Sequence, residues 1–396
     1  MKNIIVLAPF VTLPNEPYFD RFLYLCYLWS KEFNVTLITS RFCHFNKSHR
    51  VPNVKELTDL PFNLVLLDEP GYKKNVSFDR IYSHYIFQKC FQKWVKKEHK
   101  FMSNIDVVYS AFPLIVTNLI IGKLKHIFGY KMIIDIQDIW PDSIFSAIPF
   151  LKRIDFFLMP LRSKAYKAYS YADGIVAVSN TYLELALKQC PDTPGLSVYL
   201  GADYELIESV EARQLDTSKI RLVYIGTLSH SYDLETVIEG FIDVRTNIQN
   251  VELHILGDGP KRSQLEKKAG DGIFFHGYMP YEKMIAFVKS CDIAINPFVS
   301  SAMQSITNKL SDYIALGLPI LSSQKSEEAS NIIERSGGYL FQSNPTSFAS
   351  LARQMIVHTQ SKRKEELKDN KLLFDRRVTY PQITKFLEEI CRSPNQ

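Results

Sequence analysis

The stretch that decides the fold covers residues 301–323 and reads SAMQSITNKLSDYIALGLPILSS. A helix that begins near Thr307 leaves its first backbone N–H groups without internal partners, and such groups form an anion site. Lys309 lies in that first turn, where the helix dipole favours acidic side chains, so an anionic ligand would explain its presence. GLPILSS then ends the helix and opens a strand. The alternative is an ordinary amphipathic helix before a buried strand.

Length and composition predict two domains with an uneven charge. At 396 residues the chain exceeds one typical domain, and 46% hydrophobic residues are ample for two cores. The first 200 residues carry 24 Lys and Arg against 17 Asp and Glu, whereas the remainder carries 23 against 25. A basic first half fits an anionic partner such as a membrane surface or a phosphorylated substrate. A solvated basic surface without function is the alternative, and we expect no binding to nucleic acid.

Cysteine usage and hydropathy favour a cytosolic protein. The six cysteines show no C-x-x-C spacing, which fits neither a disulfide framework nor a zinc site. The apolar run at the start is too short for a signal peptide. The sequence also contains no uninterrupted run of 18 apolar residues, so we expect no membrane span. Residues 80–102 and 150–172 mix aromatic residues with basic ones. Such helices lie in a membrane interface or, alternatively, pack on a core with a basic outer face.

The first half of the chain predicts a parallel sheet covered by helices. Its apolar runs are rich in β-branched residues, as in buried parallel strands, and they alternate with segments of helical periodicity. We expect strands at residues 3–9, 34–40, 62–70, 106–113, 131–138 and 174–179, and helices at 19–33, 80–101, 114–128, 153–171 and 181–189. The loop after the first strand contains no glycine, which counts against a dinucleotide fingerprint.

The second half repeats this alternation after a segment rich in Pro, Gly and Asp at residues 191–203, which we interpret as a domain boundary. We expect strands at residues 221–226, 251–257, 272–277, 292–297, 318–323 and 337–341, and helices at 234–245, 262–269, 281–290, 307–315, 326–336 and 381–392. The fold class is therefore α/β and doubly wound. The predicted domains are residues 1–198 and 199–370, with a terminal helical segment at 371–396.

Residues at the strand ends of the second half suit a nucleotide. Gly226 and Gly257 allow a backbone to approach closely, and the Thr227 hydroxyl can donate to a phosphate. Asp312 can accept from ribose hydroxyls, and Lys309 can neutralise a diphosphate. Each glycine alone is more often a simple turn, so the set carries the interpretation. The candidate nucleotide-binding residues are Gly226, Thr227, Gly257, Asp258, His276, Gly277, Ser305, Thr307, Asn308, Lys309 and Asp312.

In the first half, DIQDIWPDSIF places three carboxylates, Asp135, Asp138 and Asp142, at or just after the end of an apolar strand. Such carboxylates can act as acid or base, accept from sugar hydroxyls or bind a metal, and Asp138 is the leading candidate. Asp142 is alternatively a helix N-cap. Basic residues also lie beyond the first two expected strands, at the same edge of the sheet. The candidate acceptor-binding residues are Arg21, Arg41, His44 and Asp142.

Together these stretches resemble a GT-B glycosyltransferase, specifically the retaining glycosyltransferase family four, and within it bacterial enzymes that build O-antigen and capsular polysaccharide. The resemblance rests on LITSRFCHF, DIQDIWPDSIF, YADGIVAVSNTYL, YIGTLSHSYDLETVIEGF, ILGDGP, HGYMP and NKLSDYIALGLPI, in the family's order. It implies two Rossmann-like domains facing a cleft, with a terminal helix that crosses back to the first domain. The second domain would hold a nucleotide-diphosphate sugar, linked to UDP or GDP, and the first domain the acceptor.

The sequence departs from the family's pattern at the donor contacts. Two glutamates eight positions apart usually flank the donor, and Gln304 and Asp312 stand at those positions. An arginine and a lysine usually follow the first strand of the second domain, and Thr227 and Tyr232 replace them. Lys309 therefore becomes the leading cation for the diphosphate. The candidate catalytic residues are Asp138, Lys309 and Gln304.

The resemblance also implies a mechanism and partners. Transfer would retain the anomeric configuration, along a front-face route through an oxocarbenium-like state. Backbone amides at residues 307–309 and the Lys309 side chain would stabilise the leaving diphosphate, without a metal ion or other cofactor. The expected acceptor is a saccharide linked to a polyprenyl diphosphate. The protein would then bind peripherally to the cytoplasmic face of the inner membrane.

Three other hypotheses remain. A nucleotide-sugar 2-epimerase of the GT-B type would turn over its substrate without an acceptor. A catalytically inactive partner subunit would keep the fold and lose donor binding, and the neutral Gln304 and Thr227 motivate that hypothesis. A dinucleotide oxidoreductase is the least favoured, because no G-x-G-x-x-G follows a strand.

Overall fold

The computed structural model describes residues 1–14, 16, 19–51, 57, 59–74, 77–141, 155–299, 306–361 and 371–393. Within these ranges the chain divides into two units. The first unit contains residues 1–141, 155–198 and 380–393, and the second contains residues 199–379. The chain passes between the units after Val198 and again between Thr379 and Tyr380.

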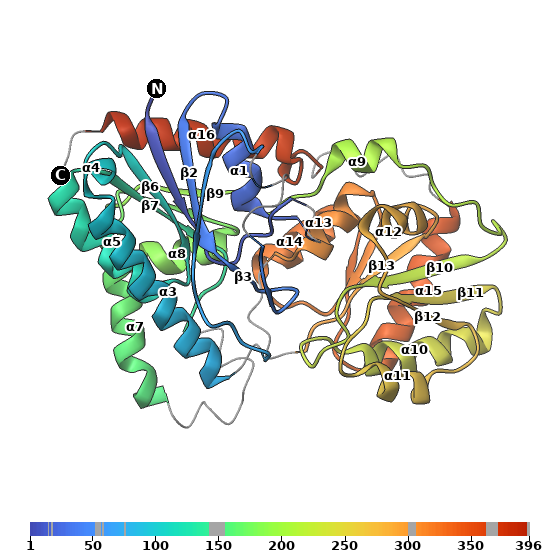
Figure 1. Cartoon of the computed structure of the whole chain (residues 1–396). Helices are drawn as coiled ribbons and strands as arrows, with labels where there is room; N and C mark the ends of the chain where they lie inside the picture. The colour runs from blue at the N-terminus through green and yellow to red at the C-terminus, as the bar shows by residue number, and fades with distance from the viewer. Residues whose placement is uncertain are drawn as a thin grey trace. The chain divides into compact units, whose positions relative to one another are not determined.

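The first unit is built on a parallel sheet, which has seven strands within the described residues (Figure 1). In sheet order these are β5 (Asn63–Leu67), β2 (Asn34–Ser40), β1 (Asn3–Leu7), β6 (Val107–Phe112), β7 (Lys131–Ile136), β8 (Gly174–Ala177) and β9 (Gly195–Ser197). Every residue of β6, β7 and β8 is buried, as expected for parallel strands that are covered on both faces. A short antiparallel pair, β3 (Phe42–Cys43) and β4 (Ser48–His49), follows β2.

Helices cover this sheet, and side-chain caps fix where several of them begin. They are α1 (Arg21–Trp29), α3 (Phe78–Lys97), α4 (His99–Met102), α5 (Ile115–Phe128), α7 (Asp155–Tyr169) and α8 (Asn180–Leu187). The Asp20 carboxylate accepts from the Leu23 amide, and the Ser77 and Ser179 hydroxyls cap α3 and α8 in the same way. Such caps satisfy N–H groups that have no partner within the helix.

The last helix, α16 (Arg376–Arg392), completes the core of the first unit (Figure 1, red). Its Tyr380, Phe386 and Leu387 belong to the same buried cluster as Trp29 of α1 and the apolar side chains of β1. The Trp29 indole N–H donates to the Thr384 hydroxyl over 3.0 Å. The first unit therefore depends on a helix that lies about 180 residues further along the chain than its last strand.

The second unit is built on a parallel sheet of six strands among the described residues. In sheet order these are β12 (Ile273–Gly277), β11 (Val251–Leu256), β10 (Ile220–Ile225), β13 (Ile293–Asn296), β14 (Ile320–Ser322) and β15 (Tyr339–Leu340). The chain moves outward from β10 in one direction and then, from β13, in the other. The switch point between β10 and β13 is where open α/β sheets bind their ligands, outside the carboxyl ends of the strands.

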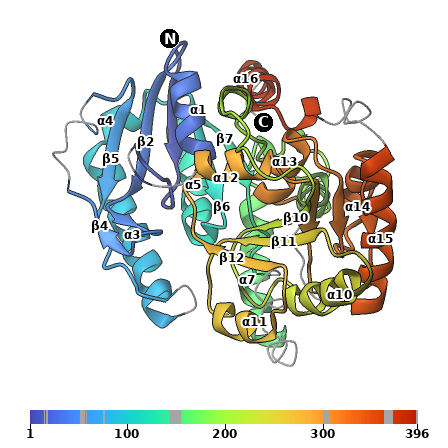
Figure 2. The same ribbon diagram turned by 90° about the vertical axis from the view of Figure 1, so that its right-hand side faces the viewer.

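Two helical layers cover this sheet. One face carries α10 (Leu234–Asn247), α11 (Arg262–Lys268) and α15 (Pro345–Ser361), with α10 and α15 packed against each other (Figure 2). The other face carries α9 (Tyr204–Ser209), α12 (Tyr281–Val288), α13 (Asn308–Ala315) and α14 (Glu327–Arg335). A short 3-10 helix, η3 (Lys371–Leu373), precedes α16. The α/β fold with two Rossmann-like units is thus confirmed.

The two ends of the second unit are joined by backbone hydrogen bonds. The Ala202 amide donates to the Phe374 carbonyl over 2.8 Å, within an isolated parallel bridge between Ala202 and Asp375. The Arg376 guanidinium donates to the carbonyls of Leu200 and Gly201, over 3.1 and 2.8 Å. The segment that enters the second unit therefore lies beside the segment that leaves it.

The expected strands and helices are present, with ends that differ by a few residues. The predicted boundary at residues 191–203 proves more structured than expected, because it contains β9, which pairs with β8. The helices α9 and α15 and the pair β3–β4 were not predicted. The predicted terminal segment at residues 371–396 differs in extent from the part grouped with the first unit, which begins at Tyr380.

Candidate functional site

Three loops of the second unit pack together at the carboxyl edge of its sheet. Gly226 follows β10 and Gly257 follows β11. Their φ angles are 132° and 131°, which residues other than glycine rarely adopt. The Gly226 amide donates to the Leu256 carbonyl over 2.9 Å, and the Gly257 amide donates to that of Gly277 over 2.8 Å. A Cβ atom at Gly257 would lie 2.0 Å from the Gly226 oxygen. The predicted glycines therefore lie side by side.

Thr227 and Asp258 are exposed at the tips of the same loops. The Leu228 amide donates to the Asp258 carbonyl, which joins the two tips. The Asp258 carboxylate accepts from the Gly259 amide over 2.7 Å and from Arg262 over 3.1 Å. The Thr227 hydroxyl is thus open to a ligand, whereas the Asp258 side chain already holds the start of α11.

Lys309 is buried in the first turn of α13, inside a box of aromatic rings. Its Nζ lies 3.3 Å from the ring centroid of Tyr232, 4.4 Å from that of Tyr224 and 5.8 Å from that of Phe298. Nζ also donates to the Tyr224 hydroxyl over 3.2 Å. A Cβ atom at Gly226 would lie 3.2 Å from this nitrogen. Lys309 thus meets the loop after β10 at the switch point of the sheet.

Two effects act in opposite directions on the charge of Lys309. The surrounding aromatic rings favour the ammonium form by cation–π attraction, which contributes about 2 kcal/mol when the contact is desolvated. Burial disfavours it, and the penalty for an ion without a counter-charge is several kcal/mol. Burial dominates and holds the pKa of the Lys309 amine well below its ordinary value. An anion at this position would reverse that balance.

The amino end of α13 has the features of an anion site. Thr307 precedes the helix in an extended conformation, with φ −101° and ψ 159°, and its side chain makes no capping hydrogen bond. The Thr307 hydroxyl is buried, and no described residue is its partner. By contrast, Asp233 caps α10 and Asp203 caps α9. The first amides of α13 are therefore not used by the Thr307 side chain.

Asp312 lies one turn after Lys309, and its carboxylate accepts from the Tyr281 hydroxyl over 2.7 Å. Burial raises the pKa of this carboxyl to about 6, while the Tyr281 hydrogen bond and Arg376 act in the opposite direction. The next residue, Tyr313, accepts from the Ile225 amide over 2.8 Å and donates to the Ile295 carbonyl over 3.2 Å. Tyr313 therefore holds α13 against the ends of both β10 and β13.

His276 lies apart from this group. Its ring stacks on His254, with 3.0 Å between a nitrogen of each ring, and packs against Phe287 of α12. Burial lowers the pKa of His276, and the charge of Arg213 lowers it further. No hydrogen bond, ion pair or ring contact among the described residues joins His276 to Lys309 or Asp312, whereas the carbonyl of the neighbouring Gly277 accepts from the Gly257 amide.

In the first unit, the structure gives Arg21 a position that does not support the predicted acceptor contact. The Arg21 and Asp135 side chains are fully buried, and their ion pair spans 2.7 Å. The Tyr109 hydroxyl donates to the same Asp135 oxygen over 2.6 Å, and Arg21 also donates to the Val198 carbonyl. This network joins α1 to the strands from inside the core, and the burial of Arg21 was not foreseen from the sequence.

The remaining candidates of the first unit lie on loops. Arg41 follows β2 and pairs with Asp68 over 2.5 Å at the surface. His44 follows β3, and its Nδ1 atom makes a hydrogen bond with the Tyr72 hydroxyl. Asp138 is half-buried two residues after β7. Three further candidates, Asp142, Gln304 and Ser305, fall outside the described residues.

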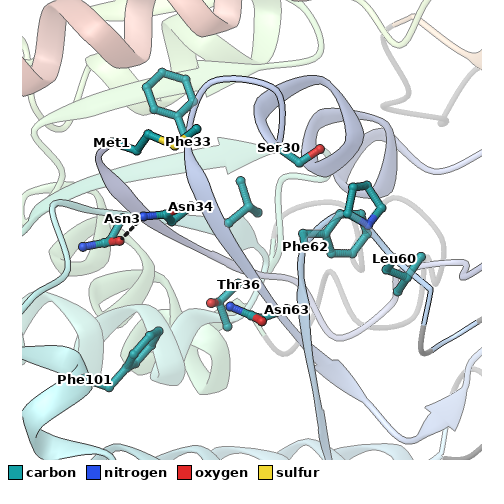
Figure 3. Close-up of a pocket in the computed structure, with 12 residues that line it drawn as sticks. Met1, Asn3, Ser30, Phe33, Asn34, Thr36, Leu60, Phe62, Asn63 and Phe101 are labelled. Carbon is teal, nitrogen blue, oxygen red and sulfur yellow. Dashed lines mark hydrogen bonds between the residues drawn. The ribbon is translucent and has the colours of Figure 1, made fainter.

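A pocket of about 480 Å³ opens at the other edge of the first sheet (Figure 3). It lies at the amino ends of β1, β2 and β5, where Asn34 donates to the Asn3 side chain over 3.0 Å. None of the predicted site residues lines it. Ligands of parallel α/β sheets bind at the opposite edge, so we do not assign this pocket to the site.

The aromatic residues around Lys309 and the Tyr281 partner of Asp312 were not predicted as site residues. Tyr224 is 85 positions from Lys309 in the sequence, and Tyr281 is 31 positions from Asp312. One signal was present, because Tyr232 stands where the family that the sequence resembles usually has a lysine. Its ring now lies against the lysine that α13 supplies.

Comparisons with known proteins agree with the fold. Residues 219–358 match the family described as glycosyl transferases group 1. An uncharacterized glycosyltransferase of Methanocaldococcus jannaschii is 24% identical over 318 residues, which cover 69% of this chain and 80% of the relative.

Two solved structures are similar over nearly the whole chain. The lipopolysaccharide outer core galactosyltransferase WaaB has a TM-score of 0.66 and 14% identity, with 98% of this chain and 99% of that chain covered. The Anabaena protein Alr3699/HepE, in complex with UDP-glucose, has a TM-score of 0.63 and 14% identity, with 98% and 100% covered. Part of the second unit is therefore similar to the glycosyl transferases group 1, and the chain has the fold of the GT-B glycosyltransferases.

Proposed function

We propose that this protein transfers a sugar from a nucleotide-diphosphate sugar to a saccharide acceptor, with retention of the anomeric configuration. One observation carries the proposal. The buried amine of Lys309 and the first turn of α13 meet Gly226 at the switch point of the second sheet. Backbone amides and an amine that an anion would charge are the groups that a leaving diphosphate requires.

The donor contacts follow from these positions. The diphosphate would accept from the amides at the start of α13 and from the Lys309 ammonium, which the arriving anion favours over the neutral amine. Asp312 would accept from the ribose hydroxyls, held in place by Tyr281. The UDP-glucose complex of HepE supports a UDP-sugar as donor.

The transfer itself breaks the bond from the anomeric carbon to the diphosphate and forms a new bond to the acceptor oxygen on the same face. The acceptor proton passes to the leaving diphosphate, so no separate protein base is required. Gln304 and Asp138 stay proposed contacts of the sugar and of the acceptor. The charge that develops on the diphosphate is stabilised by groups already in place.

The acceptor that we propose is a saccharide linked to a polyprenyl diphosphate, in the synthesis of a bacterial surface polysaccharide. The name of WaaB, a lipopolysaccharide galactosyltransferase, supports this class. Within the described residues, no helix combines the length and apolar character needed to span a bilayer. Peripheral contact is supported by α3, whose first two turns expose Phe78, Ile81, Tyr82 and Tyr85 by 50–89%.

The proposal is tested by measuring heat protection and turnover with a panel of nucleotide sugars. We expect one of them to protect the protein, and nucleoside diphosphate release to begin only when a lipid-linked acceptor is added. Lys309→Met should weaken nucleoside diphosphate binding about 10- to 100-fold, since a charge-assisted hydrogen bond is lost. Lys267→Met, on the exposed face of α11, is the matched control.

Other outcomes separate the alternatives. Turnover of the nucleotide sugar without an acceptor would favour the 2-epimerase. Failure of every nucleotide sugar to protect the protein would favour an inactive partner subunit. Equal nucleotide affinity in wild type and Lys309→Met would remove Lys309 from the donor site.

A further inference from the structure

The pocket of about 480 Å³ at the amino edge of the first sheet has no part in the proposed function. Its volume lies within the range of about 300–1,000 Å³ that small-molecule sites occupy. Polar side chains from the first residues of three strands line it (Figure 3), and these are Asn3 of β1, Asn34 and Thr36 of β2, and Asn63 of β5. We name it the amide pocket after these four residues.

The register of the strands places the four side chains on one face of the sheet. Asn3 lies opposite Asn34 in the β1–β2 pair, and Thr36 lies opposite Asn63 in the β2–β5 pair. Asn34 and Thr36 are two positions apart on one strand, so their side chains point to the same face. A ligand in the amide pocket would therefore meet a continuous polar surface that two adjacent pairs of residues form.

Hydrogen bonds fix the direction of two of the amides. The Asn3 side chain donates to the Asn104 carbonyl over 2.8 Å. A carbonyl only accepts, so the nitrogen of the Asn3 amide points to it and the oxygen points to Asn34. The Asn34 nitrogen donates to that oxygen over 3.0 Å. The Asn34 oxygen is therefore left as an acceptor, and no described residue donates to it.

Thr36 and Asn63 supply further polar groups to the amide pocket. Thr36 is only 4% exposed, and no described residue makes a hydrogen bond with its hydroxyl. The Asn63 amide, at the exposed start of β5, also has no hydrogen-bond partner among the described residues. A nearly buried hydroxyl gains stability when a ligand supplies the missing hydrogen bond.

The remainder of the lining is largely apolar. Phe62, which precedes β5, and Phe101 of α4 belong to it. Of the described residues that line the amide pocket, none carries a charged side chain. A charged ligand would lose part of its hydration here without gaining a counter-charge, whereas a neutral polar ligand would exchange water for hydrogen bonds.

We infer that the amide pocket binds a neutral saccharide. The Asn34 oxygen requires a donor, the Asn63 amide offers both kinds of group, and the Thr36 hydroxyl can act either way. Sugar hydroxyls donate and accept as well, and the C–H groups of a sugar ring can pack on a phenylalanine ring. The inference goes beyond the proposed function, because the amide pocket lies at the opposite edge of the sheet from the proposed acceptor contacts.

The test measures the binding of glucose, galactose, mannose and N-acetylglucosamine to the full chain by saturation-transfer NMR. We expect at least one of these sugars to bind, and to bind equally well to Lys309→Met. Thr36→Val keeps the shape of the side chain without the hydroxyl, so its thermal stability should equal or exceed that of wild type. Thr36→Val and Asn63→Leu should each weaken sugar binding about 3- to 10-fold, as the loss of one neutral hydrogen bond predicts. Asn247→Leu, at the exposed end of α10, is the matched control.

Several outcomes would overturn the inference. One is that none of the four sugars binds, and another is that wild type, Thr36→Val and Asn63→Leu bind them equally. Sugar binding that is lost in Lys309→Met but kept in Thr36→Val would place the sugar in the donor site. Uridine that binds in place of the sugars, and is lost in Thr36→Val, would assign the amide pocket to a nucleoside.

The inference and the proposed function can fail separately. Sugar binding that depends on Thr36, in a protein that no nucleotide sugar protects against heat, would support the inference and count against the proposed function. Protection by a nucleotide sugar without binding of the free sugars would do the reverse. If Asn63→Leu unfolds at a lower temperature than wild type, the comparison with Thr36→Val decides.

Discussion

We propose that the one buried amine of Lys309 replaces the two cations that the resembled family usually places after the first strand of its second domain. In the first turn of α13 it lies against Tyr232, the residue that stands where the family usually has a lysine. A second cation at that position would repel the first one. The Tyr232 ring instead packs against the amine, so the protonation state of Lys309 depends on whether an anionic ligand is bound.

Substitution of Lys309 by methionine should raise stability and lower affinity together. Methionine fills a similar volume without a buried amine, and the Tyr224 hydroxyl keeps its hydrogen bond to the Thr227 carbonyl. We expect the free energy of unfolding without ligand to rise by roughly 1–3 kcal/mol. Urea unfolding with and without nucleoside diphosphate measures both effects. A less stable variant would show that the rings retain a charged ammonium.

The raised pKa of Asp312 predicts a dependence on pH. A carboxyl whose folded-state pKa is about 6, against an ordinary value of 3.8, contributes stability below pH 4 that is lost as pH rises through 6. Asp312→Asn has no carboxyl to ionise, so at pH 7 its free energy of unfolding should exceed that of wild type by up to about 3 kcal/mol. Thermal unfolding at pH 4 and pH 7 gives the comparison. The same variant should bind nucleotide more weakly, and parallel pH profiles for both proteins would contradict the assignment.

The sequence could identify Lys309 and Asp312 but not their surroundings. Local spacing placed both side chains in one turn of a helix before a strand. Tyr224, Tyr281 and Phe298 reach them through tertiary contacts, for which one sequence holds no periodic signal. The burial of Arg21 was not foreseen for the same reason, since a charged residue at the start of α1 is expected to be exposed until its buried partner Asp135 is known.

At the scale of elements, helix α3 combines two surfaces. Phe87, Phe91 and Val95 are buried, while the first two turns expose apolar side chains and the later turns expose lysines. Sequence reasoning found the mixed character of this helix but left its interpretation open. Amphipathic periodicity shows which positions alternate, and only the packed unit shows which face remains outside.

A membrane role for α3 predicts binding to anionic vesicles that depends on its exposed apolar residues. Phe78→Ser combined with Ile81→Ser should reduce the bound fraction at least about tenfold, since each buried side chain contributes about 1.5–3 kcal/mol. Vesicle sedimentation measures the bound fraction, and its change between two salt concentrations gives the part of the binding that is due to the lysines. Val357→Ser removes an equally exposed residue from α15 of the second unit and is the control. Equal sedimentation of all three proteins would exclude α3.

At the scale of the whole molecule, the apolar runs predicted both sheets, whereas the return of the terminal helix to the first domain was expected only from the family resemblance. Buried parallel strands leave continuous apolar runs, which is why the strands of both sheets could be recognised. The strand β9 is only three residues long and lies in a segment rich in Pro and Gly, so its signal is that of a linker. The membership of α16 in the first core is a tertiary contact that a periodic pattern cannot show.

That membership predicts a long-range effect on stability. Leu387→Ala, near the end of the chain, should destabilise the first unit by about 2–5 kcal/mol, because Leu387 is fully buried beside β1. Trp29, Trp94 and Trp140 are the three tryptophans, and all lie in the first unit, so their fluorescence follows its unfolding. Lys385→Ala, on the exposed face of α16, is the control. Unchanged unfolding in Leu387→Ala would place α16 outside the core.

The backbone bridge between Ala202 and Asp375 makes the second unit an insert within the chain of the first. Both ends of the insert lie side by side, and because α16 begins at Arg376, a cut just before that residue would leave α16 and the strands of the first sheet intact. Chimaeras joined at such points would combine the second unit of one protein with the first unit of a relative and test whether the proposed donor and acceptor roles separate with the units. The same adjacency would allow a circular permutant of the second unit, in which a short linker joins its two ends and new ends are opened in a surface loop.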